Sequence, residues 1–209
     1  MKILGICGSL RKKSNSNKLV KTIAESSGCD FDLIYLKDLE IKPCKGCAAC
    51  MMNEGKCPIR DDMELINQKL METDALIIGS PTYGWDVSGA VKTMLDRSSA
   101  IYFREIGPLY NEDMPFLGKR PLAGKSAVPV IIAAGFGHER ALETLTLYLE
   151  HNNKMNVVDK IAEATYAQDV YDLPDVMKHA EQAGEKLGNA LKQRSPELSL
   201  RYESNNLLA

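Results

Sequence analysis

The sequence has almost no surplus of charge and no long apolar run. Lysine and arginine number 26 against 28 aspartates and glutamates, so the formal net charge is −2. A chain without a basic surplus lacks the electrostatic attraction for nucleic acid or for an acidic membrane surface, and we expect neither as a partner. No apolar run approaches the roughly 18 residues that a membrane-spanning helix needs, so we expect no membrane span.

The N-terminal segment also lacks the marks of a secretory signal. Residues 1–7 read Met-Lys-Ile-Leu-Gly-Ile-Cys, which is too short for a signal peptide and has no cleavage site of small residues. A secreted disulfide scaffold spreads its cysteines through a short chain, whereas most of the 6 cysteines here fall between positions 44 and 57. We therefore expect a cytoplasmic protein whose clustered cysteines serve metal or redox chemistry.

The length and composition are those of one folded domain. A chain of 209 residues with 44% hydrophobic residues can bury a core, and at ~150 residues per domain it forms one domain, with or without an insertion. We predict a single domain over residues 1–193 and a C-terminal tail over 194–209. Within the domain, segments 37–60 and 100–124 exceed ordinary loop lengths, and such long loops are usually functional or interfacial.

Short β-branched runs alternate with segments of helical spacing. Strands are expected over 3–7, 31–36, 75–79 and 127–134, with a weaker fifth over 157–162. Helices are expected over 17–26, 63–72, 88–98, 138–151 and 174–192. Several strand runs are apolar throughout, as strands covered on both faces are. The alternation predicts an α/β fold: a five-stranded parallel sheet in flavodoxin-like order, with helices on both faces, forming a three-layer sandwich.

A loop rich in hydroxyl and amide side chains follows the first expected strand. Residues 8–17 read Gly-Ser-Leu-Arg-Lys-Lys-Ser-Asn-Ser-Asn and lead into a helix. The loop lacks both the Gly-x-Gly-x-x-Gly dinucleotide pattern and the Gly-Lys-Ser/Thr of an ATP-binding loop. Hydroxyls, backbone N–H groups and a helix N-terminus make an anion site, and one arginine among them suits a phosphomonoester such as that of FMN. Helix capping by Ser14 or Ser16 is expected as well.

The loop after the third expected strand is rich in proline, glycine and aromatic residues. Residues 80–89 read Ser-Pro-Thr-Tyr-Gly-Trp-Asp-Val-Ser-Gly. They place a rigid turn and flat side chains at the same sheet edge, which suits an isoalloxazine ring; ordinary packing is the alternative for Tyr83 and Trp85. After the fourth strand, the glycine-rich loop 135–137 can approach the ring by its backbone. The next residue, His138, is either a helix-terminal residue or a proton donor.

The cysteine loop is the sharpest motif in the chain. Its pattern is Cys-x2-Cys-x2-Cys-x6-Cys-Pro over residues 44–58, which is similar to ferredoxin ligation with a longer last gap. Three cysteines at three-residue spacing let a coiled loop point three sulfurs inward, and a fourth thiolate closes a cubane corner. Structural zinc usually comes from two separated Cys-x2-Cys pairs. We expect a 4Fe–4S cluster, with zinc and an unoccupied or oxidised loop as the alternatives.

Together these motifs resemble the flavodoxin-like NAD(P)H-dependent FMN reductase superfamily and, within it, the iron–sulfur flavoproteins. The resemblance covers residues 1–193, and Asp61-Asp62-Met63 opens the next helix directly after the cysteines, as in that family. On this basis the residues assigned to the FMN phosphate are Ser9, Arg11, Ser14, Asn15, Ser16 and Asn17. Those assigned to the flavin ring are Pro81, Thr82, Tyr83, Gly84, Trp85 and Gly135. The cluster ligands are Cys44, Cys47, Cys50 and Cys57.

The resemblance implies a flavin-dependent oxidoreductase. Electrons would pass between a one-electron carrier such as ferredoxin, or NAD(P)H, and a small acceptor: oxygen, peroxide or a quinone-like compound. The alternatives are an NAD(P)H-dependent FMN or quinone reductase without a cluster, and a non-catalytic metal-binding or partner-binding module.

We also expect a homodimer or homotetramer, because the cysteine loop and the 100–124 insertion are hard to bury within one such domain. The expected contact residues are Tyr102, Phe103, Tyr110 and Phe116, with local packing as the alternative.

Overall fold

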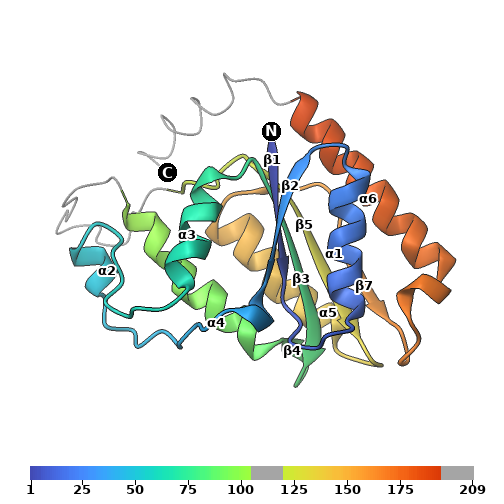
Figure 1. Cartoon of the computed structure of the whole chain (residues 1–209), viewed down its shortest axis with the longest axis horizontal. Coiled ribbons are helices and arrows are strands. Elements are labelled where there is room, and N and C mark those ends of the chain that lie inside the picture. The colour runs from blue at the N-terminus through green and yellow to red at the C-terminus, as the bar shows by residue number, and fades with distance from the viewer. Residues whose placement is uncertain (105–119, 194–209) are drawn as a thin grey trace.

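A parallel β-sheet forms the centre of the computed structural model, which describes residues 1–104 and 120–193 (Figure 1). Its strands are β1 (Lys2–Cys7), β2 (Asp30–Tyr35), β3 (Ala75–Tyr83), β4 (Asp86–Val87), β5 (Ser126–Ala133), β6 (Asn156–Val157) and β7 (Ile161–Ala164). The order is β2-β1-β3-β5-β6, and β7 pairs with β5 beyond β6, so β6 and β7 share the last position. This arrangement confirms the predicted flavodoxin-like fold.

Helices cover both faces of the sheet (Figure 1). They are α1 (Asn15–Ser26), α2 (Ala49–Met52), α3 (Met63–Glu72), α4 (Gly89–Ser98), α5 (His138–Thr146) and α6 (Pro174–Gln193). On one face α1 and α6 pack together, and on the other α3, α4 and α5 lie over the sheet. None of the described helices is long and apolar enough to cross a membrane.

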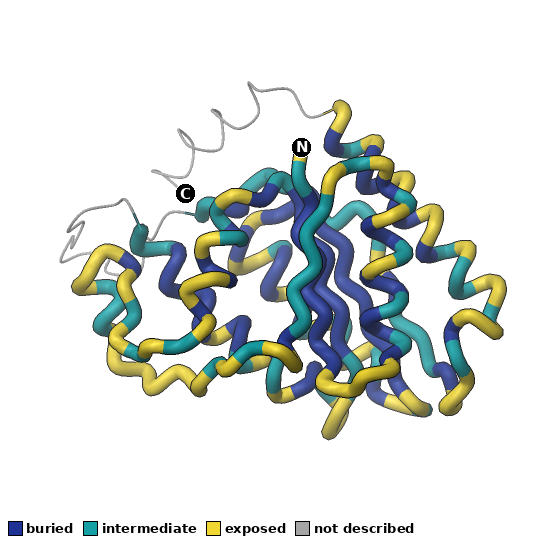
Figure 2. The backbone as a smooth tube through the Cα atoms, in the orientation of Figure 1, coloured by how far each residue is buried: buried dark blue, intermediate teal, exposed yellow. Residues whose placement is uncertain are grey.

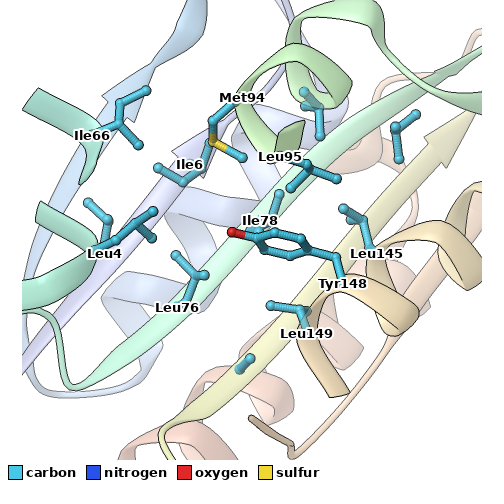
Figure 3. Close-up of a cluster of buried hydrophobic side chains, with 14 of the residues drawn as sticks. Leu4, Ile6, Ile66, Leu76, Ile78, Met94, Leu95, Leu145, Tyr148 and Leu149 are labelled. Carbon is cyan, nitrogen blue, oxygen red and sulfur yellow. The ribbon is translucent and has the colours of Figure 1, made fainter. Parts of the chain in front are cut away.

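Each central strand contributes side chains to two hydrophobic clusters. Successive side chains of a strand point to opposite faces, so Leu4 and Ile6 of β1 join the cluster under α3, α4 and α5, while Ile3 joins the one under α1 and α6. Figure 3 shows the first cluster, with Tyr148 among its aliphatic side chains. Because both faces are covered, these strands are apolar throughout, which is the pattern that identified them in the sequence.

The structure differs from the predicted elements in three places. Strand β3 continues to Tyr83 because Thr82 and Tyr83 pair with β4 in a hairpin. The predicted helix over 138–151 is α5 followed by a π-helix, Leu147–Asn152, after which the Asn153 N–H donates to the Tyr148 carbonyl. The predicted fifth strand is split into β6 and β7.

The two predicted irregular segments are described only in part. Residues 105–119 of the insertion, with Tyr110 and Phe116, and the tail 194–209 lie outside the described residues. Of the described contact candidates, Tyr102 packs against the hydrophobic core and has the Arg120 guanidinium 4.5 Å from its ring centroid. Local packing therefore accounts for Tyr102. Figure 2 shows that exposure is concentrated in the loops, including most of the segment that carries the cysteines.

Candidate flavin and cysteine sites

Three loops meet at the carboxyl edge of the sheet, the lower edge in Figure 1. The Gly8 N–H donates to the Gly79 carbonyl at 2.8 Å, and the Ser88 hydroxyl donates to the Gly8 carbonyl at 3.0 Å. The Ser88 N–H donates to the Ser80 hydroxyl at 2.9 Å. A Cβ at Gly8 would lie 2.4 Å from the Gly79 oxygen, so only glycine allows this close approach. The first and third βα loops therefore form one unit, as a ligand site at this edge requires.

The loop after β1 is held in shape by Asn17. Its side-chain oxygen accepts from the Ser9 N–H at 3.2 Å, and its side-chain nitrogen donates to the Ser9 carbonyl at 3.3 Å. Ser14 is the N-cap of α1 and accepts from the Asn17 N–H at 3.4 Å, which settles the choice between Ser14 and Ser16. The Ser14 and Ser16 hydroxyls lie 3.0 Å apart. The loop conformation is fixed by its own hydrogen bonds.

This loop has the donors that a phosphate needs. The hydroxyls of Ser14 and Ser16 lie at the N-terminus of α1, whose first turn carries no acidic residue, and the backbone of Ser9 is bound to Asn17 in the same turn. Arg11 is exposed, and within the described chain its side chain makes no hydrogen bond or ion pair. The residues present therefore fit a phosphomonoester.

Asn15 lies at the same helix start but is used differently. Its side chain donates to the Gln168 carbonyl at 2.6 Å and accepts from the Val170 N–H at 3.3 Å. Lys18, one turn further, pairs with Asp169 and lies 4.5 Å from the centroid of the Tyr171 ring. The side chain of Asn15 therefore holds the loop between β7 and α6. Of the groups of Asn15, its backbone N–H is the one left for the predicted contact with the phosphate.

The loop after β3 is a tight hairpin at the same edge. Tyr83 pairs with Asp86, and the two turn residues both have positive φ, 57° at Gly84 and 67° at Trp85. This is the geometry of a type I′ turn, which is strained for a bulky residue such as tryptophan. Trp85 is 67% exposed and Tyr83 50% exposed, so ordinary core packing does not explain either side chain.

Polar atoms without partners lie behind this hairpin. Among the described residues, Thr82 Oγ1 and His138 Nδ1 are buried and have no hydrogen-bond partner. A Cβ at Gly137 would lie 3.1 Å from the Trp85 Cα, so the loop after β5 packs directly on the hairpin. Exposed aromatic rings with unpaired polar groups beside them suit a flat heteroaromatic ligand.

Two further aromatic side chains are exposed on loops that follow strands. Phe136, within the predicted glycine-rich loop after β5, is 75% exposed, and Tyr166, which no motif marks, is 69% exposed on the loop after β7. Positive φ angles at Tyr166 and Ala167 are a second sign of local strain there. The fold brings the loop after β5 against the hairpin and the loop after β7 against Asn15.

The four clustered cysteines lie on a coiled and mostly exposed loop. All four are free thiols; Cys44 and Cys47 are exposed, whereas Cys50 and Cys57 are half-buried. The pKa of the Cys50 thiol is raised above its ordinary value, chiefly by burial and next by the neighbouring Cys57. Four residues with positive φ coil the loop: Gly46, Ala48, Glu54 and Gly55.

Four thiols are the donor set of a 4Fe–4S cluster, so the chemical nature of these side chains fits such a cluster. In the described parts of the chain, however, no three of the Cys, His, Asp and Glu side chains are gathered closely enough to hold a metal ion.

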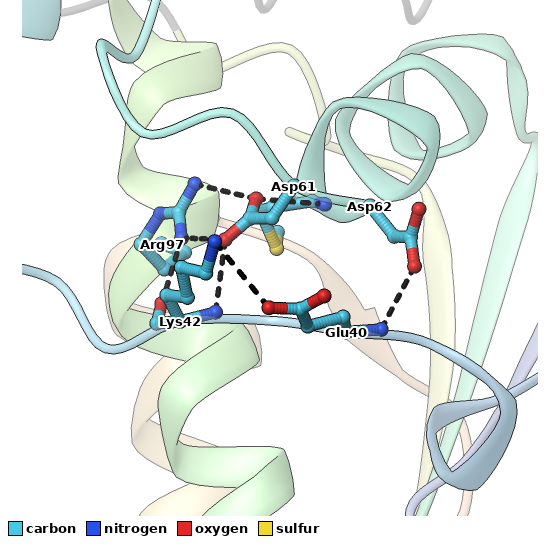
Figure 4. Close-up of polar contacts among 6 residues, drawn as sticks. Glu40, Lys42, Asp61, Asp62 and Arg97 are labelled. Atoms are coloured by element: carbon cyan, nitrogen blue, oxygen red, sulfur yellow. Dashed lines mark hydrogen bonds and ion pairs between the residues drawn. The ribbon is translucent and has the colours of Figure 1, made fainter.

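A buried ion pair closes the base of this loop (Figure 4). Asp61 accepts two hydrogen bonds from Arg97 of α4, at 2.6 and 2.9 Å, and both side chains are at most 2% exposed. Arg97 also donates to the Lys42 carbonyl at 2.7 Å, and the Lys42 N–H donates to Asp61 at 2.8 Å. Burial raises the pKa of the Asp61 carboxyl, but the hydrogen bonds from Arg97 and from the Lys42 and Met63 N–H groups, together with the Arg97 charge, outweigh burial and hold this pKa below its ordinary value. Arg97 thus ties the two ends of the cysteine loop to each other and to α4.

The sheet order defines a flavodoxin-like α/β protein, and the loops at its hydroxyl-rich edge fit a phosphorylated, flat ligand. The chain belongs to the NADPH-dependent FMN reductase family, which it matches over residues 1–168. That family consists of flavin-dependent oxidoreductases.

Curated relatives are iron–sulfur flavoproteins. One from Archaeoglobus fulgidus is 46% identical over 101 residues, and one from Methanocaldococcus jannaschii is 45% identical over 102 residues. Each match covers 47% of this chain and about half of the relative, 49% and 52%. Another Archaeoglobus fulgidus iron–sulfur flavoprotein is 29% identical over 203 residues, covering 93% of this chain and 82% of its own length.

Solved structures agree on the fold. A flavone reductase superposes with a TM-score of 0.70 at 19% identity, covering 92% of this chain and 64% of that one. An archaeal flavodoxin superposes with a TM-score of 0.56 at 15% identity, covering 92% of this chain and 100% of that one.

Proposed function

We propose that the chain is an iron–sulfur flavoprotein that carries FMN at the sheet edge and a 4Fe–4S cluster on the cysteine loop. It would transfer electrons between a one-electron carrier such as ferredoxin and a small acceptor: oxygen, peroxide or a quinone-like compound. One observation carries the proposal: α4 connects the two sites. Ser88 at its N-terminus is hydrogen-bonded to the flavin-edge loops, and Arg97 at its C-terminus holds the cysteine loop.

The residues at the sheet edge have separate tasks toward FMN. The hydroxyls of Ser9 and Ser16 and the N-terminus of α1 would hold the phosphate, with Arg11 supplying a positive charge. The hairpin at Tyr83 and Trp85 would cover the ring, and the unpaired Thr82 hydroxyl would supply a hydrogen bond to it. FMN exchanges one or two electrons and the cluster one, so together they would couple one-electron and two-electron chemistry.

The cysteine loop has the properties of a site that closes around its ligand. Its ends are fixed by the buried pair of Asp61 and Arg97, while the segment between them is coiled and mostly exposed. Metal binding commonly organises such a segment, because the ligand geometry is rarely formed in advance. Cys44, Cys47, Cys50 and Cys57 would be ligands and not nucleophiles.

The two sites of one chain lie at opposite ends of α4. A helix of ten residues is about 15 Å long, and the cysteines lie beyond its C-terminal end. We therefore include in the proposal a homodimer or homotetramer in which the cysteine loop of one copy approaches the flavin edge of another. Light scattering on the full chain and on a deletion of residues 104–118 tests it: we expect an oligomer that the deletion weakens. A monomer with full electron transfer from cluster to flavin would contradict this assembly.

One observation favours a second candidate, an NAD(P)H-dependent FMN or quinone reductase without a cluster. In the described residues the cysteine sulfurs are not gathered into a ligand set, and Cys44 and Cys47 are exposed. In that case the cysteines would serve the structure of the loop.

Anaerobic purification followed by absorption spectroscopy and analysis of iron, sulfide and flavin separates the candidates. Flavin bands with a broad visible shoulder, and about four irons per chain, support the iron–sulfur flavoprotein. Flavin bands without iron support the reductase. A colourless protein after incubation with FMN would contradict both and leave the non-catalytic binding module.

A further inference from the structure

Arg97 is a buried cation, and one of its three side-chain nitrogens has no hydrogen-bond acceptor among the described residues. Its two terminal nitrogens are taken up by Asp61 and by the Lys42 carbonyl. Its third nitrogen, Nε, is buried and has no hydrogen-bond partner among the described residues. A buried N–H without a partner costs free energy, so an unpaired donor on a side chain that is 2% exposed calls for an acceptor.

The neighbour that can supply this acceptor is Cys57. The Cys57 side chain lies near enough to the Arg97 guanidinium to interact with it electrostatically, although no hydrogen bond between the two is formed among the described residues. Cys57 also lies only four positions before Asp61, the residue that Arg97 grips. The other three cysteines precede it, on the coiled part of the loop that includes α2. Arg97 is therefore the buried charge placed beside the last cysteine of the motif.

We propose that Arg97 is a positioning residue of the cysteine site, which fixes both ends of the loop and donates a hydrogen bond to the Cys57 sulfur. The second part rests on the proposed function, since it concerns a sulfur that ligates the cluster. Arginine suits both tasks because its planar fork binds Asp61 in a bidentate manner and still has Nε–H to offer. Lysine keeps the charge, but its single ammonium nitrogen cannot bind Asp61 in a bidentate manner and also donate to Cys57 from a second nitrogen.

Two consequences follow for measurable properties. Without the guanidinium, the base of the loop loses its anchor on α4 and keeps only the direct bond from the Lys42 N–H to Asp61 between these two residues, so the backbone of residues 40–63 should exchange hydrogen faster. A hydrogen bond to a ligating sulfur stabilises negative charge on it, and the reduced cluster carries more negative charge than the oxidised one. Loss of the bond should therefore lower the reduction potential of the cluster and leave that of the flavin in place.

The experiment compares wild type, Arg97→Lys and the matched control Lys92→Ala. Lys92 lies on the same helix and forms an exposed pair with Asp96. Hydrogen exchange is measured on FMN-loaded, iron-free protein, and midpoint potentials on anaerobically reconstituted protein. For Arg97→Lys we expect at least tenfold faster exchange in residues 40–63. We also expect the reduction potential of the cluster to fall by about 59 mV, which corresponds to a tenfold change in the equilibrium constant of its one-electron reduction. Lys92→Ala should match wild type in both.

The outcomes separate this inference from the proposed function. Unchanged exchange, or an unchanged cluster potential at full iron content, in Arg97→Lys would overturn the inference. Wild type that takes up no iron would overturn the proposed function and the Cys57 bond with it, while hydrogen exchange would still decide the role of Arg97 in the loop.

A second measurement needs no variant, in case Arg97→Lys does not fold. Wild type is labelled with 15N-arginine, and its reduced cluster is studied by pulsed EPR. A resolved nitrogen coupling supports the bond, and its absence contradicts it.

Discussion

The flavin edge and the cysteine loop show two ways in which one chain builds a site. At the flavin edge, Asn17 binds both backbone groups of Ser9, and Ser88 joins two loops, so the donors are in place before any ligand arrives. In the cysteine loop a buried pair, Asp61 and Arg97, fixes the ends, and the thiols between them are exposed or half-buried. The first site is a product of sheet topology, whereas the second depends on one buried ion pair and on its ligand.

The comparison predicts that the two sites can be emptied separately, and the largest effect is expected at the cysteines. Cys57→Ser or Cys50→Ser should lose most of the iron and keep FMN, because the phosphate loop lies at the other end of α4. Cys7→Ala and Cys29→Ala should keep the iron, since Cys7 is buried in β1 and Cys29 lies directly before β2. Iron and flavin analysis after anaerobic reconstitution checks this. Stoichiometric iron in Cys57→Ser would point to another fourth ligand.

At the flavin edge, the double variant Arg11→Ala/Ser16→Ala should release FMN. Two charge-assisted hydrogen bonds of about 1.5–3 kcal/mol each would be lost, a weakening of more than a hundredfold. Fluorescence titration of the flavin-free protein measures the dissociation constant. Lys21→Ala serves as the control, because Lys21 forms an exposed pair with Glu25 along the same helix. An unchanged affinity for FMN in the double variant would show that this loop does not bind the FMN phosphate.

The buried pair should matter more for stability than any surface pair. Asp61→Asn leaves the Arg97 charge buried without its partner, which typically costs about 3–5 kcal/mol. Urea unfolding should show this loss, while Asp96→Asn, which breaks an exposed pair on α4, should change the unfolding free energy by less than about 1 kcal/mol. Equal effects of the two variants would contradict the role given to the pair.

The same pair predicts a pH dependence. The pKa of Asp61 is lowered in the folded protein from an ordinary value of 3.8. Its ionised form is therefore favoured by folding, and the stabilisation is present above pH 3.8 and declines as the pH falls toward the folded-state pKa. Unfolding free energies measured between pH 6 and pH 2 should fall less steeply with acid in Asp61→Asn than in wild type. If the unfolding free energies of the two proteins fell in parallel with pH, Asp61 would be excluded as the source of the pH dependence.

The smallest effect is expected at the flavin hairpin. Trp85 has φ of 67°, a conformation that asparagine adopts far more readily than tryptophan. Trp85→Asn should therefore stabilise the flavin-free protein by roughly 1 kcal/mol and weaken FMN binding. Thermal unfolding with and without FMN measures both the stability of the flavin-free protein and the strength of FMN binding. A destabilised flavin-free variant would show that Trp85 is held by packing and that its strain has no bearing on the ligand.

The elements that follow from local pattern could be predicted from the sequence, and those that follow from contacts between distant segments could not. The apolar runs located β1 and β3, and helix α3 begins and ends at the predicted residues. The role of the Asn15 side chain depends on Gln168 and Val170, which only the fold brings to it. The link between Arg97 and the cysteine loop likewise comes from a contact with Asp61, 36 positions away, which no local pattern marks.

An anaerobic reductive titration followed by absorption decides whether this one chain holds two redox sites. FMN takes up two electrons and a 4Fe–4S cluster one, so we expect about three electrons per chain, with bleaching of both sets of bands. An end point at two electrons, with flavin bands alone bleached in a protein reconstituted with iron and sulfide, would contradict this expectation.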